Sequence, residues 1–415
     1  MTHTLGPETG FSALGLAEAL LRALALENYT DPTPIQRAAI PALLAGRDFL
    51  GLAQTGTGKT AAFALPLLQK LRTGHEGRRA KCVRALILAP TRELAIQIAE
   101  SVRVYGRFLH LRHAVVVGGV SIGPQAKALA GGLDILVATP GRLLDHMNQG
   151  NVRLDAVETL ILDEADRMFD MGFIRDIRKI VAVLPRKRQT MLFSATMPHD
   201  VERLAKDVLH QPLRVDIVPP KRTAEKIDQR VFHVPTSEKR ALLARLLGDA
   251  NLERVIVFTR TKHCANRVAE HLGKSGFSVD AIHGNKSQNA RQRALTRFRS
   301  GEARILVATD IAARGIDVEN VSHVINFELP NEPESYVHRI GRTARAGAGG
   351  VAISFCDASE NAYLRDIERL TRGTITVAGG SIAPDAQPKP NHGSQTHRHH
   401  ASPSRRRRGG ARAGR

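Results

Sequence analysis

A short glycine-containing loop near the start of the chain has the residue types needed to hold a nucleoside triphosphate. It follows an apolar run and leads into the helical segment AAFALPLLQKL. Glycines let backbone N–H groups turn toward phosphate oxygens, a lysine reaches the β and γ phosphates, and a threonine hydroxyl binds Mg²⁺. The strict pattern has glycine where Ala53 stands, but the order of strand, loop and helix fits. The predicted loop comprises Ala53, Gln54, Thr55, Gly56, Thr57, Gly58, Lys59 and Thr60.

A cluster of acids follows the apolar run at 159–162. We expect Asp163 to hold Mg²⁺ through water and Glu164 to polarise the water that attacks the phosphate. With Asp166 nearby, these carboxylates would repel one another without a cation. A solvated turn is the alternative interpretation. The upstream Gly58-Lys59-Thr60 sequence favours a magnesium-dependent nucleoside triphosphatase instead.

Short apolar runs must position these residues. They alternate with helix-length amphipathic segments, which predicts parallel sheets covered by helices on both faces. The expected strands of the first half are 49–53, 85–89, 114–117, 135–138, 159–162 and 190–194. Those of the second half are 254–258, 279–282, 305–308, 324–327 and 351–355.

Two α/β domains are expected, because 415 residues exceed what one core usually organises. The run Ile-Leu-Val-Ala-Thr occurs at 135–139 and again at 305–309, which suggests related halves, although buried strands share few residue types. Pro219, Pro220 and the charged residues around them predict a linker at 216–226.

The charge of the chain predicts a polyanionic partner. Its formal net charge is +20 and its pI is about 10.6, which favours nucleic acid over an anionic membrane surface. Residues 378–415 lack large apolar side chains and carry eight basic residues against Asp385, so we expect a disordered tail that supplies +7. No apolar run of about 18 residues and no signal-peptide pattern occur, so a cytoplasmic protein without membrane contact is expected.

Cysteine and histidine give little support for a transition-metal site. The three cysteines are far apart in sequence and are expected to be small core residues: Cys82, Cys264 and Cys356. Four tail histidines could bind a metal, but they have no neighbouring cysteine and no fixed frame: His392, His397, His399 and His400.

The sequence Asp163-Glu164-Ala165-Asp166 makes the chain resemble the DEAD-box RNA helicases, and among them the bacterial RhlE-like subgroup. The resemblance covers about residues 9 to 375, with further motifs in the family's order. It implies two tandem RecA-like α/β domains with parallel sheets, followed by the basic tail. The expected segments are an adenine-recognising segment at 9–37, an ATP-binding domain at 38–215, the linker at 216–226, a C-terminal helicase domain at 227–377 and the tail at 378–415.

The resemblance also implies that the nucleotide is ATP. In the family's adenine segment, here YTDPTPIQ at 29–36, Gln36 would bond the adenine edge. Tyr29 belongs to the same segment, and Phe11 would pack near the base, although composition alone makes Phe11 a core residue. Asn28 stands where the family usually has glycine.

The remaining first-domain motifs imply RNA binding and coupling. Arg92, Gly119, Thr139 and Arg142 would contact phosphates and sugars, which predicts little base specificity. Ser194 and Thr196 would link hydrolysis to strand separation by hydrogen bonds to Asp166 and to the second domain. Their alternative role is a helix N-cap, and the two roles are compatible.

The second domain has no phosphate loop and is implied to complete the site. Arg342 and Arg345 would act as arginine fingers on the γ phosphate. His338 would contact the acid and hydroxyl motifs of the first domain, and Arg339 is expected to be structural. Asp317 would lie near the ribose. Arg260, Thr309 and Arg291, the last accompanied by Gln288, would contact RNA, with a basic helix surface as the alternative for Arg291. Ala344 stands where the family usually has glycine.

We therefore expect an ATP-dependent RNA helicase that needs ATP and Mg²⁺ and that closes its two domains on RNA. A DNA helicase and an ATP-gated RNA clamp with slow turnover are the alternatives. The arginine run 405–408 is expected to tether RNA or to recruit ribosomal or RNA-degradation assemblies, unless it serves only as a solubilising charge run.

Overall fold

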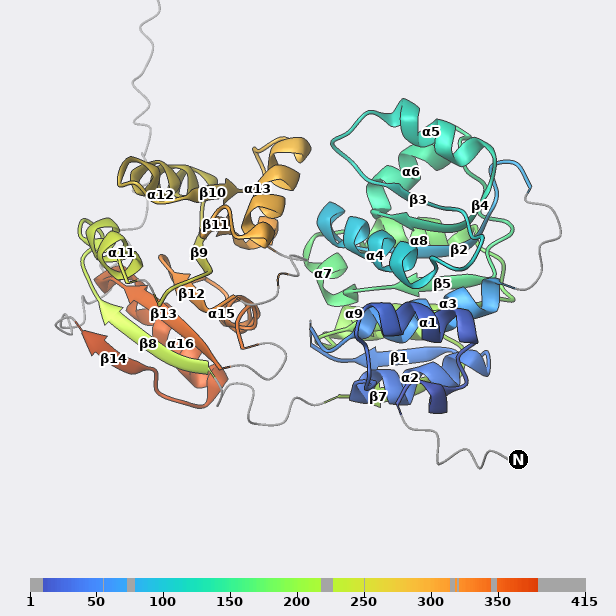
Figure 1. Ribbon diagram of the computed structural model, residues 1–415, viewed down its shortest axis with the longest axis horizontal. Coiled ribbons are helices and arrows are strands. Elements are labelled where there is room, and N and C mark those ends of the chain that lie inside the picture. Colours follow the sequence, from blue (N-terminus) through green and yellow to red (C-terminus); the bar gives the residue numbers. More distant parts are fainter. Residues whose placement is uncertain are drawn as a thin grey trace, which may run out of the picture.

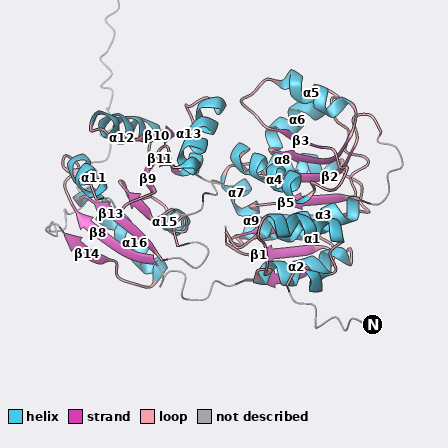
Figure 2. Ribbon diagram, in the orientation of Figure 1, coloured by secondary structure: helices cyan, strands magenta, loops and turns pink. Residues whose placement is uncertain are grey.

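The computed structural model describes residues 10–54, 56–72, 79–217, 227–249, 251–313, 318, 321–344 and 349–379. Two α/β domains follow one another along the chain, coloured blue to green and yellow to red in Figure 1. Each domain contains a seven-stranded parallel sheet, and Figure 2 shows helices on both sides of the strands. The predicted fold class is confirmed.

The first domain extends from Gly10 to residue 217. Its strands are β1 (Phe49–Leu52), β2 (Val83–Leu88), β3 (His113–Val116), β4 (Leu133–Ala138), β5 (Thr159–Leu162), β6 (Gln189–Ser194) and β7 (Leu213–Asp216). Its helices are the 3₁₀ turn η1 (Ser12–Leu14), α1 (Glu18–Leu26), α2 (Pro34–Leu44), α3 (Lys59–Leu71), α4 (Arg92–Tyr105), α5 (Ile122–Ala130), α6 (Pro140–Asn148), α7 (Ala165–Asp170), α8 (Ile174–Ala182) and α9 (His199–Val208).

The second domain begins at Ile227. Its strands are β8 (Ile227–His233), β9 (Val255–Thr259), β10 (Val279–Ile282), β11 (Ile305–Thr309), β12 (His323–Asn326), β13 (Gly350–Cys356) and β14 (Thr376–Gly379). Its helices are α11 (Lys239–Leu247), α12 (Lys262–Lys274), α13 (Gln288–Ser300), α14 (Asp310–Ala313), α15 (Pro333–Ile340), η2 (Ala358–Glu360) and α16 (Asn361–Thr371).

The two sheets have the same topology. The first has the order β3-β4-β2-β5-β6-β1-β7, and the second has the order β10-β11-β9-β12-β13-β8-β14. Renumbering the second sheet from its first strand reproduces the first order. The repeated Ile-Leu-Val-Ala-Thr run starts in β4 and recurs in β11, which hold corresponding places. The suggested relation between the halves is therefore visible in the fold.

The eleven predicted strands are all present, with ends that shift by one or two residues. Except in β3 and β10, which are mostly half-buried, their side chains are largely buried in apolar layers on both faces of each sheet, which explains the continuous apolar runs in the sequence. Three strands were not predicted: β7, β8 and β14. β7 includes Asp216 and β14 ends at Gly379, so the domains extend one and two residues beyond the predicted limits of 215 and 377.

Several simpler expectations can be compared with the fold. All three cysteines are buried, as predicted. Every helix among the described residues is too short or too polar to cross a membrane. Most of the predicted linker and nearly all of the predicted tail, with its histidines and arginines, lie outside the described residues.

Candidate active site

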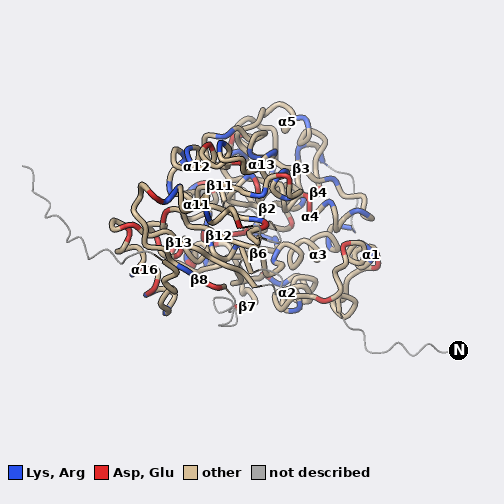
Figure 3. The backbone as a smooth tube through the Cα atoms, turned by 60° about the vertical axis from the view of Figure 1, so that its left-hand side comes forward, with Lys and Arg blue, Asp and Glu red and all other residues tan. Residues whose placement is uncertain are grey.

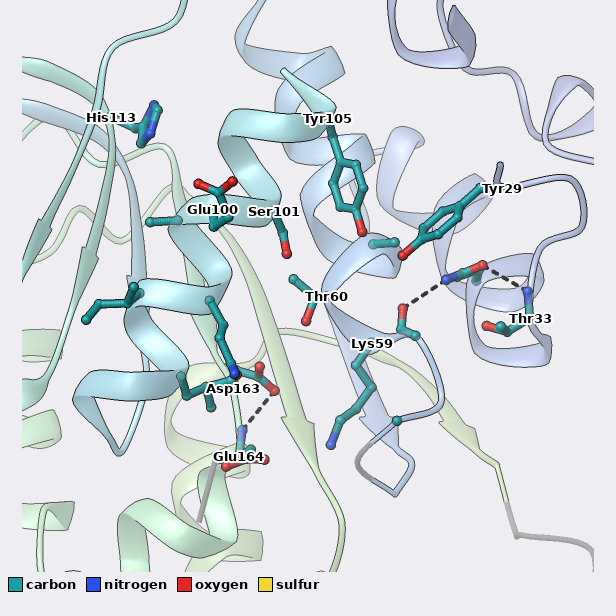
Figure 4. A pocket seen from close by; sticks show the side chains of 18 of the residues that line it. Tyr29, Thr33, Lys59, Thr60, Glu100, Ser101, Tyr105, His113, Asp163 and Glu164 are labelled. Carbon is teal, nitrogen blue, oxygen red and sulfur yellow. Dashed lines mark hydrogen bonds between the residues drawn. The ribbon is translucent and has the colours of Figure 1, made fainter. Parts of the chain in front are cut away.

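A cavity of about 1030 Å³ collects most of the predicted nucleotide-binding residues (Figure 4). They come from the residue before η1, the α1–α2 connection, the first turns of α2 and α3, the loop before α3, and the end of β5. Of the described residues of the second domain, only Gln292 and Arg299 line it. The predicted residues that line it are Phe11, Tyr29, Gln36, Gly56, Gly58, Lys59, Thr60, Asp163 and Glu164.

The loop before α3 is held in shape by its own hydrogen bonds. The buried Lys59 Nζ donates to the Ala53 carbonyl over 2.8 Å, and Thr57 Oγ1 donates to the Gln54 carbonyl over 2.8 Å. The Ala53 N–H donates to the carbonyl of Ser194 on β6, so alanine continues the sheet at this position without a special backbone conformation. Thr55 lies outside the described residues.

Gln36 connects the predicted adenine segment to this loop. Its Oε1 accepts from the Thr33 N–H at 2.9 Å, and its Nε2 donates to the Gly58 carbonyl at 3.1 Å. Gly58 has a φ of +87°, and a Cβ there would lie 2.4 Å from Gln36 Nε2. Glycine at 58 is therefore required both by the backbone conformation and by the approach of Gln36.

Phe11 and Tyr29, the other predicted residues of the adenine segment, both line the cavity. Phe11 is 5% exposed and belongs to the core, yet it also lines the cavity. Tyr29 is 43% exposed at the cavity wall. Asn28 has a φ of 58°, a left-handed conformation that asparagine tolerates better than most residues other than glycine. Asn28 can therefore form the turn for which the family usually uses glycine.

Asp163 and Glu164 are buried at the carboxyl end of β5. Asp163 Oδ1 accepts from the Glu164 N–H at 2.9 Å. Burial raises the pKa of Asp163 to about 6, with Lys59 opposing the rise and Glu164 adding to it. Glu164 has a φ of 53°, and its Oε2 accepts from Arg167 Nη1 at 2.8 Å. A left-handed glutamate at a cavity wall is the kind of strain found at functional sites.

The donors at this end of the cavity suit Mg²⁺. The Asp163 carboxylate and the Thr60 hydroxyl both line it, and oxygen is the ligand that Mg²⁺ prefers. No group of three or more His, Cys, Asp or Glu among the described residues could hold a metal by itself. Mg²⁺ needs no such group where one carboxylate and substrate phosphates supply the ligands.

The predicted coupling residues of the first domain form one hydrogen-bonded cluster. Thr196 donates to Asp166 Oδ2 from its hydroxyl at 3.0 Å and from its N–H at 2.9 Å. Ser194 Oγ accepts from the Asp166 N–H at 3.1 Å and donates to the Thr196 carbonyl. Burial works against ionisation of Asp166, but Lys59, Arg167 and Thr196 outweigh it and lower its pKa. Neither hydroxyl caps α9, whose N-cap residue is Pro198.

Four predicted RNA-binding residues lie at the carboxyl ends of β2, β3 and β4. The Arg92 guanidinium packs on Gly119, where a Cβ would be 1.9 Å from Nη1. Burial and the neighbouring Arg291 lower the pKa of Arg92, so cations are crowded here. Arg142 Nη1 donates to the Val120 carbonyl at 2.9 Å, and Thr139 is the N-cap residue of α6.

The contact between the domains involves Arg291 and Gln288, for which the sequence predicted contact with RNA, and Glu93, which was not predicted as a site residue. Arg291 of α13 pairs with Glu93 of α4 at 3.0 Å, and both side chains are nearly buried. Gln288 Nε2 donates to Glu93 Oε1 at 3.2 Å, and its Oε1 accepts from Arg92 Nη1 at 3.3 Å. Arg291 thus contacts the first domain in this structure. The role of Glu93 was missed, although an acid beside Arg92 was visible in the sequence.

The predicted catalytic arginine Arg342 is held inside the second domain. It is 4% exposed, and its Nε donates to the His338 carbonyl at 3.3 Å. Neither Arg342 nor His338 lines the large cavity. Arg339 forms two hydrogen bonds with Asp310 and donates to Asn326 and to the Glu328 carbonyl, so the expectation of a structural role fits. Arg345 and Asp317 lie outside the described residues.

The remaining predicted RNA contacts of the second domain lie at the carboxyl ends of β9 and β11. Thr309 is the last residue of β11 and is nearly buried. Arg260 follows β9 and lies between two acids, Glu328 at 3.8 Å and Glu360 at 3.3 Å. Figure 3 shows further basic residues along α12 and α13, on the same domain. This distribution agrees with the predicted polyanionic partner.

Comparisons with known proteins agree with this geometry. A DEAD/DEAH box helicase model matches residues 33–204, and a helicase conserved C-terminal domain model matches residues 238–347. The ATP-dependent RNA helicase CshA of Limosilactobacillus reuteri is 44% identical over 362 residues, covering 87% of this chain and 72% of the relative. The CshA of Listeria monocytogenes is 45% identical over 364 residues, covering 88% and 69%.

Solved structures extend the likeness to both domains. Saccharomyces cerevisiae Dbp5 bound to RNA and ADP BeF3 has a TM-score of 0.79 and 32% identity, covering 90% of this chain and 96% of that one. Relatives above 40% identity across most of both chains, together with motifs gathered around one large cavity, establish the family. The chain belongs to the DEAD-box family of ATP-dependent RNA helicases.

Proposed function

We propose that this chain separates or remodels short RNA duplexes by closing its two domains around ATP and an RNA strand, and that hydrolysis reopens them. The observation that supports this most directly is the division of the site. The first domain gathers the nucleotide-binding residues in one cavity, whereas Arg342 is held within the second domain, outside that cavity. Hydrolysis would then depend on domain movement.

In the first domain, Lys59 would exchange the Ala53 carbonyl for the phosphates. This exchange would strengthen its hydrogen bond, because a charged acceptor replaces a neutral one. Thr60 and Asp163 would hold Mg²⁺, the latter through water. The bound cation would neutralise phosphate charge. Glu164, oriented by Arg167, would polarise the attacking water. Gln36 would read the adenine edge from its place between Thr33 and Gly58.

In the second domain, Arg342 would leave the His338 carbonyl and reach the γ phosphate on closure. Arg345 would act beside it, and Asp317 would approach the ribose. His338 would contact the Asp166, Ser194 and Thr196 cluster, which would report the state of the phosphates to the other domain. The roles of Arg342 and His338 are inferred from position and chemistry, whereas those of Arg345 and Asp317, which lie outside the described residues, rest on the family resemblance.

RNA would lie across the carboxyl ends of the strands of both domains. Arg92, Gly119, Thr139 and Arg142 on one side, and Arg260, Thr309 and Arg291 on the other, offer cations, hydroxyls and backbone groups. Such groups bind phosphates and sugars and select little for base. Arg291 would have to exchange Glu93 for a phosphate, so its RNA contact would compete with the interdomain pair.

The decisive experiment compares phosphate release with and without RNA in the wild type and in Glu164→Gln. RNA should accelerate release in the wild type, and the variant should lose the accelerated rate while it still binds ATP and RNA. DNA of the same sequence should stimulate little, because a 2′-hydroxyl distinguishes RNA. Equal wild-type rates with and without RNA would exclude coupling. Stimulation by DNA alone would favour the DNA helicase alternative.

A clamp with slow turnover is the second candidate. RNA release slower than one ATP turnover would support the clamp. Four expectations stay predictions: membership of the RhlE-like subgroup, the cytoplasmic location, the tethering of RNA by residues 405–408, and the recruitment of ribosomal or degradative assemblies. Deletion after residue 379 should weaken RNA binding at low salt if the tail tethers RNA.

A further inference from the structure

The C-terminal end of α4 contacts the part of the chain that leads into the adenine segment. Three contacts occur there, made by Tyr105, the last residue of α4, and by Arg107 and Phe108 just beyond it; we call these three residues the α4 platform. Their partners are Tyr29 just beyond α1, Glu27 at its C-cap, and Arg22 within the helix. No phosphate, magnesium or RNA role assigned above involves the platform.

The first contact joins two aromatic rings of unequal burial. Tyr105 is 6% exposed, whereas Tyr29 is 43% exposed, and their ring centroids are 6.1 Å apart at an interplanar angle of 53°. Figure 4 shows both hydroxyl ends directed toward the same part of the cavity. Burial, together with the nearby Tyr29 and opposed by Ser101, raises the pKa of Tyr105, so its hydroxyl stays protonated.

The second and third contacts hold α1 itself. Arg107 forms an ion pair with Glu27, and the Arg22 guanidinium lies 4.3 Å from the centroid of the Phe108 ring. The turn that follows α1 is tied back to it, because the Tyr29 N–H donates to the Leu24 carbonyl at 3.0 Å. Fixing α1 against α4 therefore fixes the place at which Tyr29 leaves the helix.

A half-exposed tyrosine has little burial of its own to select one orientation, so a neighbour must restrict it. Aromatic pairs favour tilted arrangements at this ring separation. Because Tyr105 already holds the Tyr29 ring in place, Tyr29 would lose little conformational entropy when the nucleotide binds. We propose that Tyr105, Arg107 and Phe108 are positioning residues for base recognition. They hold Tyr29 and the turn before Gln36 at the cavity wall. This inference rests on the proposed adenine recognition.

A simple structural brace is the competing explanation, and the chain offers a matched control. Arg103 lies in the last turn of α4 and pairs with an acid, but its partner is Glu100 of the same helix. Arg103→Gln removes the same charge and the same kind of ion pair as Arg107→Gln, but it leaves the Arg107–Glu27 ion pair in place. A brace would alter the melting temperature and kcat, whereas a positioning role would alter the KM for ATP.

The experiment measures RNA-stimulated kcat and KM with ATP and with GTP for the wild type, Arg107→Gln, Tyr105→Leu, Arg103→Gln and Gln36→Ala. We expect Arg107→Gln to raise the KM for ATP about threefold and Tyr105→Leu about tenfold, as one surface ion pair and one aromatic pair would require. Their kcat values and the KM for GTP should change less than about twofold, and Arg103→Gln should match the wild type.

The outcomes separate the two proposals. If the wild type and Gln36→Ala use ATP and GTP equally well, adenine recognition itself is wrong. If Gln36→Ala loses discrimination while Arg107→Gln and Tyr105→Leu retain the wild-type KM for ATP, the platform is only a brace. Equal effects of Arg103→Gln and Arg107→Gln on the KM for ATP would also contradict the positioning role of the α4 platform. Arg107→Gln remains informative if Tyr105→Leu does not fold, because its pair is one-third exposed.

Discussion

Two lysines hold the same place in the two domains and have different surroundings. Lys59 is the first residue of the helix after β1, and Lys239 is the first residue of the helix after β8, the corresponding strand of the second sheet. Lys59 donates to a backbone carbonyl beside a large cavity. Lys239 is sealed between Glu360 and Asp357, the latter at 3.0 Å.

The difference shows how one topology serves two purposes. When phosphate replaces the Ala53 carbonyl, Lys59 gives up only a neutral acceptor, so it can change partner. Replacing Glu360 would abandon a fully buried carboxylate, which is costly, so Lys239 is fixed. Burial works against ionisation of Asp357, but hydrogen bonds from Ser359, Thr236 and Lys239 outweigh it and lower its pKa. In the second domain, two acids thus neutralise the position that we propose binds phosphate in the first.

The largest effect should follow from Lys59→Ala. We expect RNA-stimulated phosphate release to fall by more than about a thousandfold, because the β and γ phosphates lose their cation. The melting temperature should change little, since only one bond to a carbonyl is lost. Stopped assays of phosphate release together with calorimetry measure both. A variant that retained hydrolysis would show that the two lysines are equally structural.

Arg342→Gln should produce a loss of about a thousandfold in kcat, the lower end of the range for an arginine finger. Its matched control is Arg339→Gln, in the last turn of α15 just before Arg342. That variant leaves Asp310 without its two guanidinium bonds, so it should lower the melting temperature first. Rapid-quench kinetics and thermal unfolding distinguish the two. The assignment fails if Arg342→Gln loses stability and keeps its kcat.

Lys239→Met should destabilise the second domain by about 3 to 5 kcal/mol, because Asp357 loses its buried cation and the fully buried Glu360 keeps Arg260 but loses Lys239. The double variant Lys239→Met with Glu360→Gln should recover part of this loss, because the buried charge is gone as well. Urea titration of the isolated chain measures the difference in unfolding free energy. If Lys239→Met instead abolished ATP binding and left stability intact, the comparison with Lys59 would have to be reversed.

These contrasts explain which features of the fold and the site could be predicted from the sequence. The loop before α3 and the acids after β5 are short contiguous segments, so their chemistry was visible. Strands buried on both faces were found as apolar runs, but β7 has alternating exposure and β14 is largely exposed, so neither gives that signal. The pairs Glu93–Arg291 and Lys239–Glu360 join residues that are distant in sequence. Only folding brings such partners together, and no local pattern predicts them.

The smallest effect concerns Ala344, beside the proposed arginine finger Arg345. Ala344 has a φ of 55°, in the left-handed region that costs a residue with a Cβ about 1 kcal/mol relative to glycine. Ala344→Gly should therefore stabilise the folded state by up to about 1 kcal/mol, less the larger entropy that glycine gains on unfolding. Urea titration measures the stability, and kcat shows whether the strain serves catalysis. A more stable variant with reduced kcat would mean that the strained turn helps to present the arginines, whereas unchanged kcat would make the alanine a tolerated departure from glycine.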